Sequence, residues 1–223
     1  LEIKTALEEY FKNFKRPQLQ STPFLQLPSP EYIKENNIEK EQAFSVLTIG
    51  FIGPKLGSED ESILNTIESV LNNSDHHLIE LDPWNSLFIK NHSYLNGGFF
   101  TISSLTSQEK ENKMKTALLN ILKKIKNNPI SNLELLNAKN FQLGHYLHTL
   151  QYYHHQAYWN AQGHFLNKPL TYVQDVQKDI KKVSIKDVQE TALKYFDFNH
   201  YNIGLLKGIQ TKAPIVETNK DSK

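Results

Sequence analysis

The sequence predicts an α+β fold, a two-layer sandwich in which helices pack on one face of a mostly antiparallel sheet. The first supporting observation is a pair of β-rich segments, about 85–95 and 97–105, with Gly97-Gly98 at the turn between them. The second is a long run of helical periodicity from about 108 to 196 that follows this hairpin. Because strands and helices are segregated along the chain, the helices are expected to cover one face of the sheet.

The N-terminal part is expected to be a helix followed by a linker. Apolar residues recur at helical spacing over residues 1–14 and share one face. Prolines then stand at positions 17, 23, 28 and 30, and proline offers no N–H to a regular element, which predicts an extended linker over 16–40. We therefore expect a tail helix of a preceding domain at 1–15, a main domain at 41–208 and a polar tail at 209–223.

The main domain is expected to open with a strand at 42–52 and an amphipathic helix. The strand alternates β-forming residues and ends at Gly53-Pro54. Ser58 stands three residues before Glu61, the spacing of a capping box, so the helix is expected to begin there. Residues 74–84 show no pattern that assigns them.

The region after the hairpin is expected to hold further helices and a closing strand at 200–206. Ser131 with Glu134 has capping-box spacing, and Ser184 with Asp187 is a weaker form of the same pattern. The expected helices span 108–126, 131–152, 154–166, 171–181 and 184–196.

Composition excludes several kinds of chemistry. The chain has 223 residues, a formal net charge of +1 and no cysteine. Without cysteine it can form no disulfide, thiolate zinc site or cysteine nucleophile. A net charge near zero gives no electrostatic reason to expect nucleic acid or an anionic membrane as a partner. No apolar run is long enough to span a bilayer, and no signal peptide is evident. Since the first residue is Leu1 rather than Met, we expect a piece of a longer polypeptide.

Two groups of histidines are candidate metal ligands. His76 and His77 precede Glu80, and on a helix His76 and Glu80 would share a face, although a proline that follows shortly favours a loop. His145 and His148 stand three residues apart in a segment rich in tyrosine and histidine, with no carboxylate close in sequence. Aromatic residues at this density more often pack a helix onto a sheet or line a cavity. A structural role is therefore the favoured interpretation of both groups.

A series of landmarks in a fixed order covers most of residues 1–207. They are residues 7–11 with 15–17, 41–44 with 49–51, 53–60, 97–100, 130–139, and 183–188 with 192 and 195–196. This series resembles the C-terminal-type, inactive domain of the insulinase (pitrilysin) family of zinc peptidases.

The resemblance implies a mitochondrial-processing-peptidase-like metallohydrolase fold, used as one of several homologous domains that close around a peptide. The family's catalytic domain carries His-x-x-Glu-His, in which the histidines bind zinc and the glutamate is the general base. That motif does not occur here. Active partner domains add an arginine and a tyrosine on the strand before the glycine pair. Here the only arginine is Arg16, in the expected linker, and Phe88, at the tyrosine-like position, has no hydroxyl to donate.

The predicted function is a non-catalytic domain of an insulinase-like zinc metalloendopeptidase, which walls the peptide chamber without supplying zinc ligands. No catalytic or metal-binding residue is assigned, and the candidate substrate-facing residues are Phe88, Gly97 and Gly98. Zinc is expected in the parent's catalytic domain only. The expected partners are neighbouring homologous domains of the same polypeptide and the parent's peptide substrate, with no nucleic acid and no membrane span. We expect a soluble protein of the bacterial periplasm or cytoplasm, and the second rather than the fourth domain of its parent.

Two alternatives stay open at this point. A purely structural assembly subunit could have the same fold with no peptidase role, as the core proteins of respiratory complexes do. A His-x-x-Glu-His motif upstream of Leu1 would favour the peptidase, and its absence would favour the assembly subunit. The other alternative is a free-standing metal hydrolase that uses His76, His77 and Glu80, which metal analysis would test.

Overall fold

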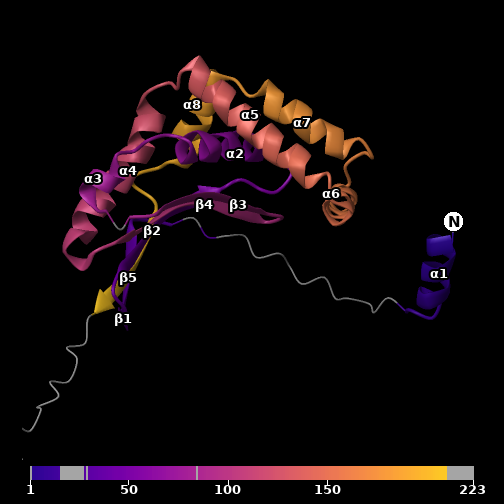
Figure 1. Ribbon diagram of the computed structural model, residues 1–223, viewed down its shortest axis with the longest axis horizontal. Coiled ribbons are helices and arrows are strands. Elements are labelled where there is room, and N and C mark those ends of the chain that lie inside the picture. Colours follow the sequence, from indigo (N-terminus) through magenta and orange to yellow (C-terminus); the bar gives the residue numbers. More distant parts are fainter. Residues whose placement is uncertain (1, 16–27, 29, 84, 210–223) are drawn as a thin grey trace, which may run out of the picture.

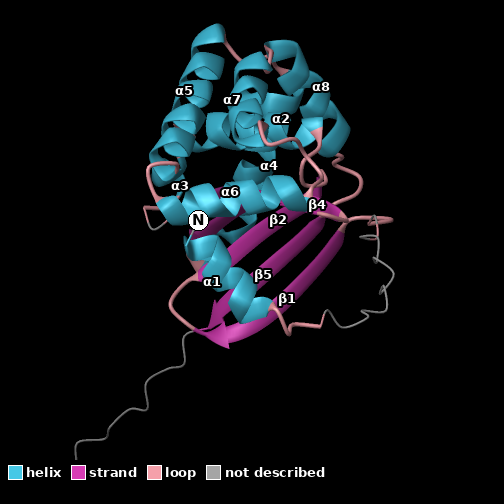
Figure 2. Ribbon diagram, turned by 90° about the vertical axis from the view of Figure 1, so that its right-hand side faces the viewer, coloured by secondary structure: helices cyan, strands magenta, loops and turns pink. Residues whose placement is uncertain are grey.

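The protein has two layers, a five-stranded sheet and helices stacked on one of its faces (Figures 1 and 2). The computed structural model describes residues 2–15, 28, 30–83 and 85–209. The expected linker residues 16–27, Arg16 among them, and the tail residues 210–223 lie outside the described residues. The predicted α+β sandwich is confirmed.

The strands are β1 (Lys34–Glu41), β2 (Ser45–Gly53), β3 (Leu87–Tyr94), β4 (Gly97–Thr106) and β5 (Asn202–Ile209). The helices are α1 (Glu2–Phe11), α2 (Glu59–Asn72), α3 (Leu78–Leu81), α4 (Glu111–Asn127), α5 (Asn132–Thr149), α6 (Tyr153–Phe165), α7 (Tyr172–Lys182) and α8 (Ile185–Tyr195), with a 3-10 turn η1 (Gln108–Lys110). In the described part of the chain, no helix is long and apolar enough to cross a membrane.

The sheet has the order β1-β5-β2-β4-β3, antiparallel except for the β1–β5 pair. Alternate residues of β2, among them Leu47, Ile49 and Phe51, are buried, while the residues between them are partly exposed. Side chains of a strand point to opposite faces in turn, so one face is covered and the other is open. The core beneath the helices contains fully buried residues of α2 and α4, such as Leu64 and Leu118.

Strand β1 was not predicted, and most of it falls in the range assigned to the linker. It pairs in parallel with β5, from Lys34 opposite Asn202 to Glu41 opposite Ile209. All eight of its residues are exposed and most are polar or charged, so it shows no hydrophobic alternation. Main-chain hydrogen bonds to β5 hold β1 at the edge of the sheet. Its charged side chains disfavour pairing of this edge with another molecule.

The predicted hairpin is confirmed, but its turn lies two residues earlier than expected. The turn residues are Leu95 and Asn96, and the glycine pair opens β4, with Tyr94 opposite Gly97. Gly97 has a φ of 136°, a conformation that L side chains rarely adopt. A Cβ on Gly98 would lie 2.5 Å from the carbonyl oxygen of Pro54 and closer still to that of His92. The pair is therefore needed for backbone conformation and close packing of main chains.

The helix starts follow the sequence at two of the three expected capping boxes. Ser131 with Glu134, and Ser184 with Asp187, form complete reciprocal boxes. The box expected at Ser58 is absent, because its hydroxyl donates to the Lys55 carbonyl at 2.6 Å. Glu61 instead accepts the Gly57 N–H at 2.5 Å. The pattern located the start of α2 correctly, but the local turn gives both side chains other partners.

Replacing Gly98 with alanine should strongly destabilise the protein, because the new Cβ would meet two main-chain oxygens that cannot move independently. We expect a loss of about 2–4 kcal/mol in the free energy of unfolding, measured by urea denaturation. The matched control is Gly204→Ala on β5, where a Cβ meets nothing within 4 Å. Equal effects of the two substitutions would contradict the assigned packing.

Candidate functional site

The open face of the sheet carries four rings on the hairpin, which we call the hairpin patch: His92, Tyr94 and Phe99, which lie together, and Phe88 farther along β3, opposite Ser103. Phe88 is 63% exposed and Phe99 39% exposed. The His92 ring stacks on Phe99 at a centroid distance of 4.5 Å, and Tyr94 lies 5.9 Å from the same ring. The predicted substrate-facing Phe88 is thus exposed on the open face of the hairpin, while Gly97 and Gly98 lie at the turn end of the hairpin, opposite Tyr94 and Ser93.

The hairpin patch is close to electrically neutral. Burial, together with the charge of nearby Lys90, lowers the pKa of His92, so its imidazole stays uncharged at neutral pH. Farther along the open face the hydroxyl groups of Thr48 and Ser103 are hydrogen-bonded to each other at 2.9 Å. This face can therefore contact a ligand through rings and hydroxyls, and the exposed Lys90, which is paired with Glu68, lies between Phe88 and His92 along β3.

The candidate metal ligands at 76–80 do not converge on a site. One ring nitrogen of His76 lies 2.7 Å from the Leu71 carbonyl oxygen. His77 is directed toward Asp75 and Glu80 instead, with 3.6 Å between its Nδ1 and an oxygen of each. Among the described residues there is no group of three or more His, Asp or Glu that could hold a metal ion. The residues present do not fit a zinc site, and the geometry does not support a metal hydrolase built on His76, His77 and Glu80.

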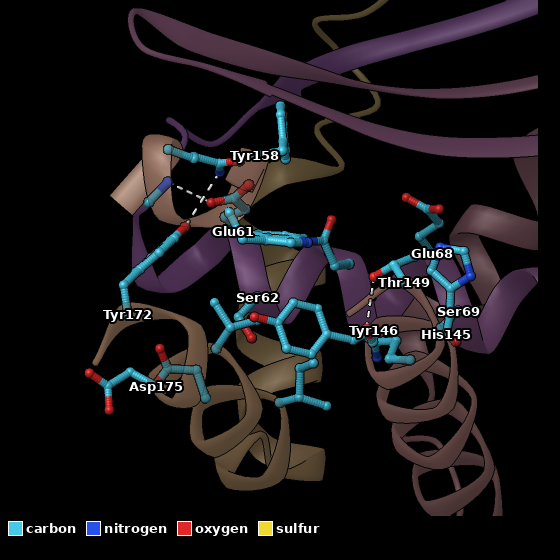
Figure 3. Close-up of a pocket in the computed structure, with 18 of the residues that line it drawn as sticks. Glu61, Ser62, Glu68, Ser69, His145, Tyr146, Thr149, Tyr158, Tyr172 and Asp175 are labelled. Carbon is cyan, nitrogen blue, oxygen red and sulfur yellow. Dashed lines mark hydrogen bonds between the residues drawn. The ribbon is translucent and has the colours of Figure 1, made fainter. Parts of the chain in front are cut away.

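A second concave region, which we call the helix cavity, lies between α2, α5, α6 and α7 (Figure 3). It has a volume of about 800 Å³, within the range of small-molecule sites. Lys90 is its only lining residue from the sheet. Close packing of α6 against α7 forms one side of it, since a Cβ on Gly163 would lie only 2.8 Å from the ring of Tyr172.

The aromatic stretch at 145–159 contributes to the wall of this cavity. Lining a cavity was one of the two roles that the sequence led us to expect for it. His145, Tyr146 and Trp159 are in its wall, whereas His148 is not. The Tyr146 hydroxyl donates to the Val173 carbonyl at 2.9 Å and so ties α5 to α7. The Tyr146 and Trp159 rings meet edge to face at 5.0 Å.

Sequence reasoning missed the acidic part of the helix cavity. Glu61 was interpreted only as a capping residue, and Asp175 received no interpretation. Both line the cavity, together with Tyr172, in which burial and the negative charge of Glu61 raise the pKa. Figure 3 shows Glu61 between Tyr158 and Tyr172. These residues come from helices far apart in the chain, so no local spacing could have identified the group.

Comparison with known proteins gives a family and a set of similar folds. A family model described as the peptidase M16 inactive domain matches residues 2–141. A search of curated proteins found no match. Among solved structures, a protease from Helicobacter pylori is similar with a TM-score of 0.82 at 18% identity, over 92% of this chain and 52% of that one. A peptidase M16 inactive domain from Pseudomonas fluorescens has a TM-score of 0.71 at 15% identity, over 86% and 48%.

One further structure is similar over nearly its whole length. It is the inactive peptidase domain of a proposed zinc protease from Bordetella parapertussis, with a TM-score of 0.70 at 14% identity, over 80% of this chain and 98% of that one. The chain spans about half the length of the Helicobacter and Pseudomonas structures.

Replacing Tyr146 with phenylalanine should change how stability depends on pH. Burial raises the pKa of Tyr146 to about 12. A group whose pKa is raised by folding stabilises the protein below its unfolded pKa, near 10, and this contribution disappears as pH rises toward 12. At neutral pH we expect Tyr146→Phe to lose about 1 kcal/mol with its hydrogen bond to Val173. The difference in the free energy of unfolding between wild type and Tyr146→Phe should become smaller between pH 10 and 12, as measured by urea denaturation.

The control for this measurement is Tyr153→Phe, at a position that is 87% exposed. It should leave the free energy of unfolding at neutral pH unchanged. A gap between wild type and Tyr146→Phe that stayed constant from pH 7 to 12 would show that Tyr146 is not buried as described.

Proposed function

The chain belongs to the peptidase M16 inactive-domain family, and from this premise we propose that it is a substrate-enclosing domain of an insulinase-like zinc metallopeptidase. Its role in the parent would be to wall a peptide chamber without supplying zinc ligands. The observation that carries this proposal is the division of the sheet into a covered face and an open face that bears the hairpin patch. The non-catalytic character of the domain follows from the family itself.

The open face has the chemistry that a chamber wall needs. Phe88, Tyr94 and Phe99 expose ring surface, and apolar contact of this kind depends little on the sequence of the peptide. The neutral His92 ring adds no fixed charge to select for or against charged peptides. Such a surface would displace water from a peptide and hold it without fixing one chemical group, while the zinc chemistry takes place on a different domain.

The proposed partners are neighbouring homologous domains of the same polypeptide. The chain spans about half of the Helicobacter and Pseudomonas structures that it resembles. Helix α1 buries none of its residues, and its apolar side chains Ile3, Leu7 and Phe11 are all exposed. An amphipathic helix gains its stability mainly by burying its apolar face. A preceding domain that packs on α1 would provide that burial.

A purely structural assembly subunit is the second candidate, because an inactive domain of this fold need not serve proteolysis. The two candidates differ in the rest of the polypeptide. A His-x-x-Glu-His motif in a preceding domain favours the peptidase, whereas a parent that lacks this motif and cleaves no peptide favours assembly.

The isolated chain is expected to bind no stoichiometric zinc and to hydrolyse no peptide, because its described residues offer no three-ligand group. Elemental analysis after dialysis against zinc, with a fluorogenic peptide assay, measures both properties. The full-length polypeptide, assayed in parallel, should show zinc and chelator-sensitive cleavage. One zinc per isolated chain, with activity lost on chelation, would overturn the proposal.

Peptide should lie against the hairpin patch in the full-length polypeptide. A photoreactive phenylalanine analogue in place of Phe88 should cross-link to a bound peptide, with the adduct identified by mass spectrometry. The matched control is the same analogue in place of Leu193 on α8, which is also well exposed but belongs to the helix layer. Cross-linking at 193 equal to that at 88 would mean that the open face does not line the chamber.

A further inference from the structure

The helix cavity is separate from the hairpin patch. The two share no residue, since the cavity is lined by α2, α5, α6, α7 and the segments that precede α2 and α7, with Lys90 alone from the sheet. Its volume of about 800 Å³ can hold a small organic molecule or an extended side chain. An inference about this cavity therefore does not rest on the proposed function of the open face.

Aromatic rings form a continuous wall of the cavity. Trp159 lies at the centre, with its ring centroid 5.0 Å from Tyr146, 5.9 Å from Tyr158 and 6.4 Å from Tyr172. Tyr158 is 62% exposed, which leaves its ring accessible from solvent. Aromatic faces carry negative charge density and attract organic cations, most strongly at tryptophan.

The charged lining residues also favour a cation. Four carboxylates line the cavity against two ammonium groups: Glu61, Glu68, Asp175 and Asp179 against Lys90 and Lys168. Three of these carboxylates are ion-paired, Glu68 with Lys90, Asp175 with Lys178 and Asp179 with Lys182, and Glu61 has no ion pair in the described part of the chain. The charge of Glu61 opposes entry of an anion and attracts a cation.

Glu61 is the carboxylate left available for a ligand. Glu68 is already bound by the Lys90 ammonium and by the Asn91 N–H. One oxygen of Glu61 accepts the Gly57 N–H, and no ion pair to Glu61 is found among the described residues. Burial raises the pKa of this carboxyl, against the opposing effects of the Gly57 hydrogen bond and the Lys168 charge. A bound cation would offset that burial.

A further unpartnered group lies in the same wall. The Ser62 hydroxyl is buried and has no hydrogen-bond partner in the described structure. A buried hydroxyl without a partner is unfavourable, and a ligand with an N–H donor would satisfy it. Ser62 follows Glu61 directly on α2 and also lines the cavity.

We propose that the helix cavity binds an organic cation, an amidinium, guanidinium or ammonium group on an apolar body. Glu61 pairs with the cationic head, and the rings of Tyr158 and Trp159 enclose the body. The cation can come from a basic side chain of a peptide or from a free amine, since both present the same group to the cavity.

Calorimetric titration of the full-length protein tests this proposal with benzamidinium as the probe and benzamide as its neutral analogue of the same shape. Benzamidinium should bind about tenfold more tightly than benzamide. Glu61→Gln should weaken benzamidinium binding about tenfold and leave benzamide binding unchanged. Gln keeps an acceptor for the Gly57 N–H, so α2 should stay folded. The matched control is Glu190→Gln on α8, which is exposed and does not line the cavity.

A second variant keeps the proposal falsifiable if Glu61→Gln proves unstable. Tyr158→Leu, at a largely exposed ring, should weaken benzamidinium binding severalfold with no change in the circular dichroism spectrum. Equal affinity for benzamidinium and benzamide, or no binding at millimolar concentration, would overturn the proposal. Acetyl-arginine-methylamide and agmatine, which share the guanidinium, then separate the sources. Tighter binding of the former indicates a peptide side chain, and equal or tighter binding of agmatine indicates a free amine.

Discussion

The close approach of main chains at Gly98 is the constraint on which the rest of the structure depends. Gly98 lies opposite Gly53 of β2 and Ser93 of β3, within contact of the carbonyl oxygens of Pro54 and His92. This contact holds three strands in one register. A shift of one residue would turn every side chain of β4 to the other face, so that Phe100 would leave the core and Phe99 would enter it. Both the packed core and the hairpin patch therefore depend on a position without a side chain.

Elements with a buried face were predictable from sequence, and the element without one was not. Strand β2 and helix α2 alternate or repeat their apolar residues because one face of each is buried, and both were located within a few residues. Strand β1 is exposed along its whole length, so burial leaves no trace in its sequence. Its position depends on β5, which lies at the other end of the chain. Only a prediction of pairing between strands far apart in the sequence could have identified β1.

The hairpin patch and the helix cavity also differ in how far the sequence predicts them. Phe88 could be singled out only through the family resemblance, which puts it at the tyrosine-like position on the strand before the glycine pair. The aromatic wall at 145–159 could be expected from composition alone. The acidic wall could not, because Glu61 and Asp175 reach the cavity only when α7 packs beside α2. Glu61 also satisfied a local explanation as a cap, and the structure shows that this explanation was wrong.

The helix cavity stays open because its walls are braced and polar. The Tyr146 hydroxyl holds α7 to α5, and the Tyr172 ring lies against Gly163 of α6. Helix α5 is itself hydrogen-bonded to α2, through Ser69 with Ala138 and Gln142 with Thr66, so α6 and α7 are held in place beside α2. To collapse onto α2 they would have to bring the half-buried Glu61 carboxylate into an apolar environment, which is strongly unfavourable for an unpaired charge. The charge that keeps the cavity from closing is the same one that would recognise a cation. A substitution that neutralises Glu61 is therefore expected to remove the preference for a cation over a neutral molecule of the same shape.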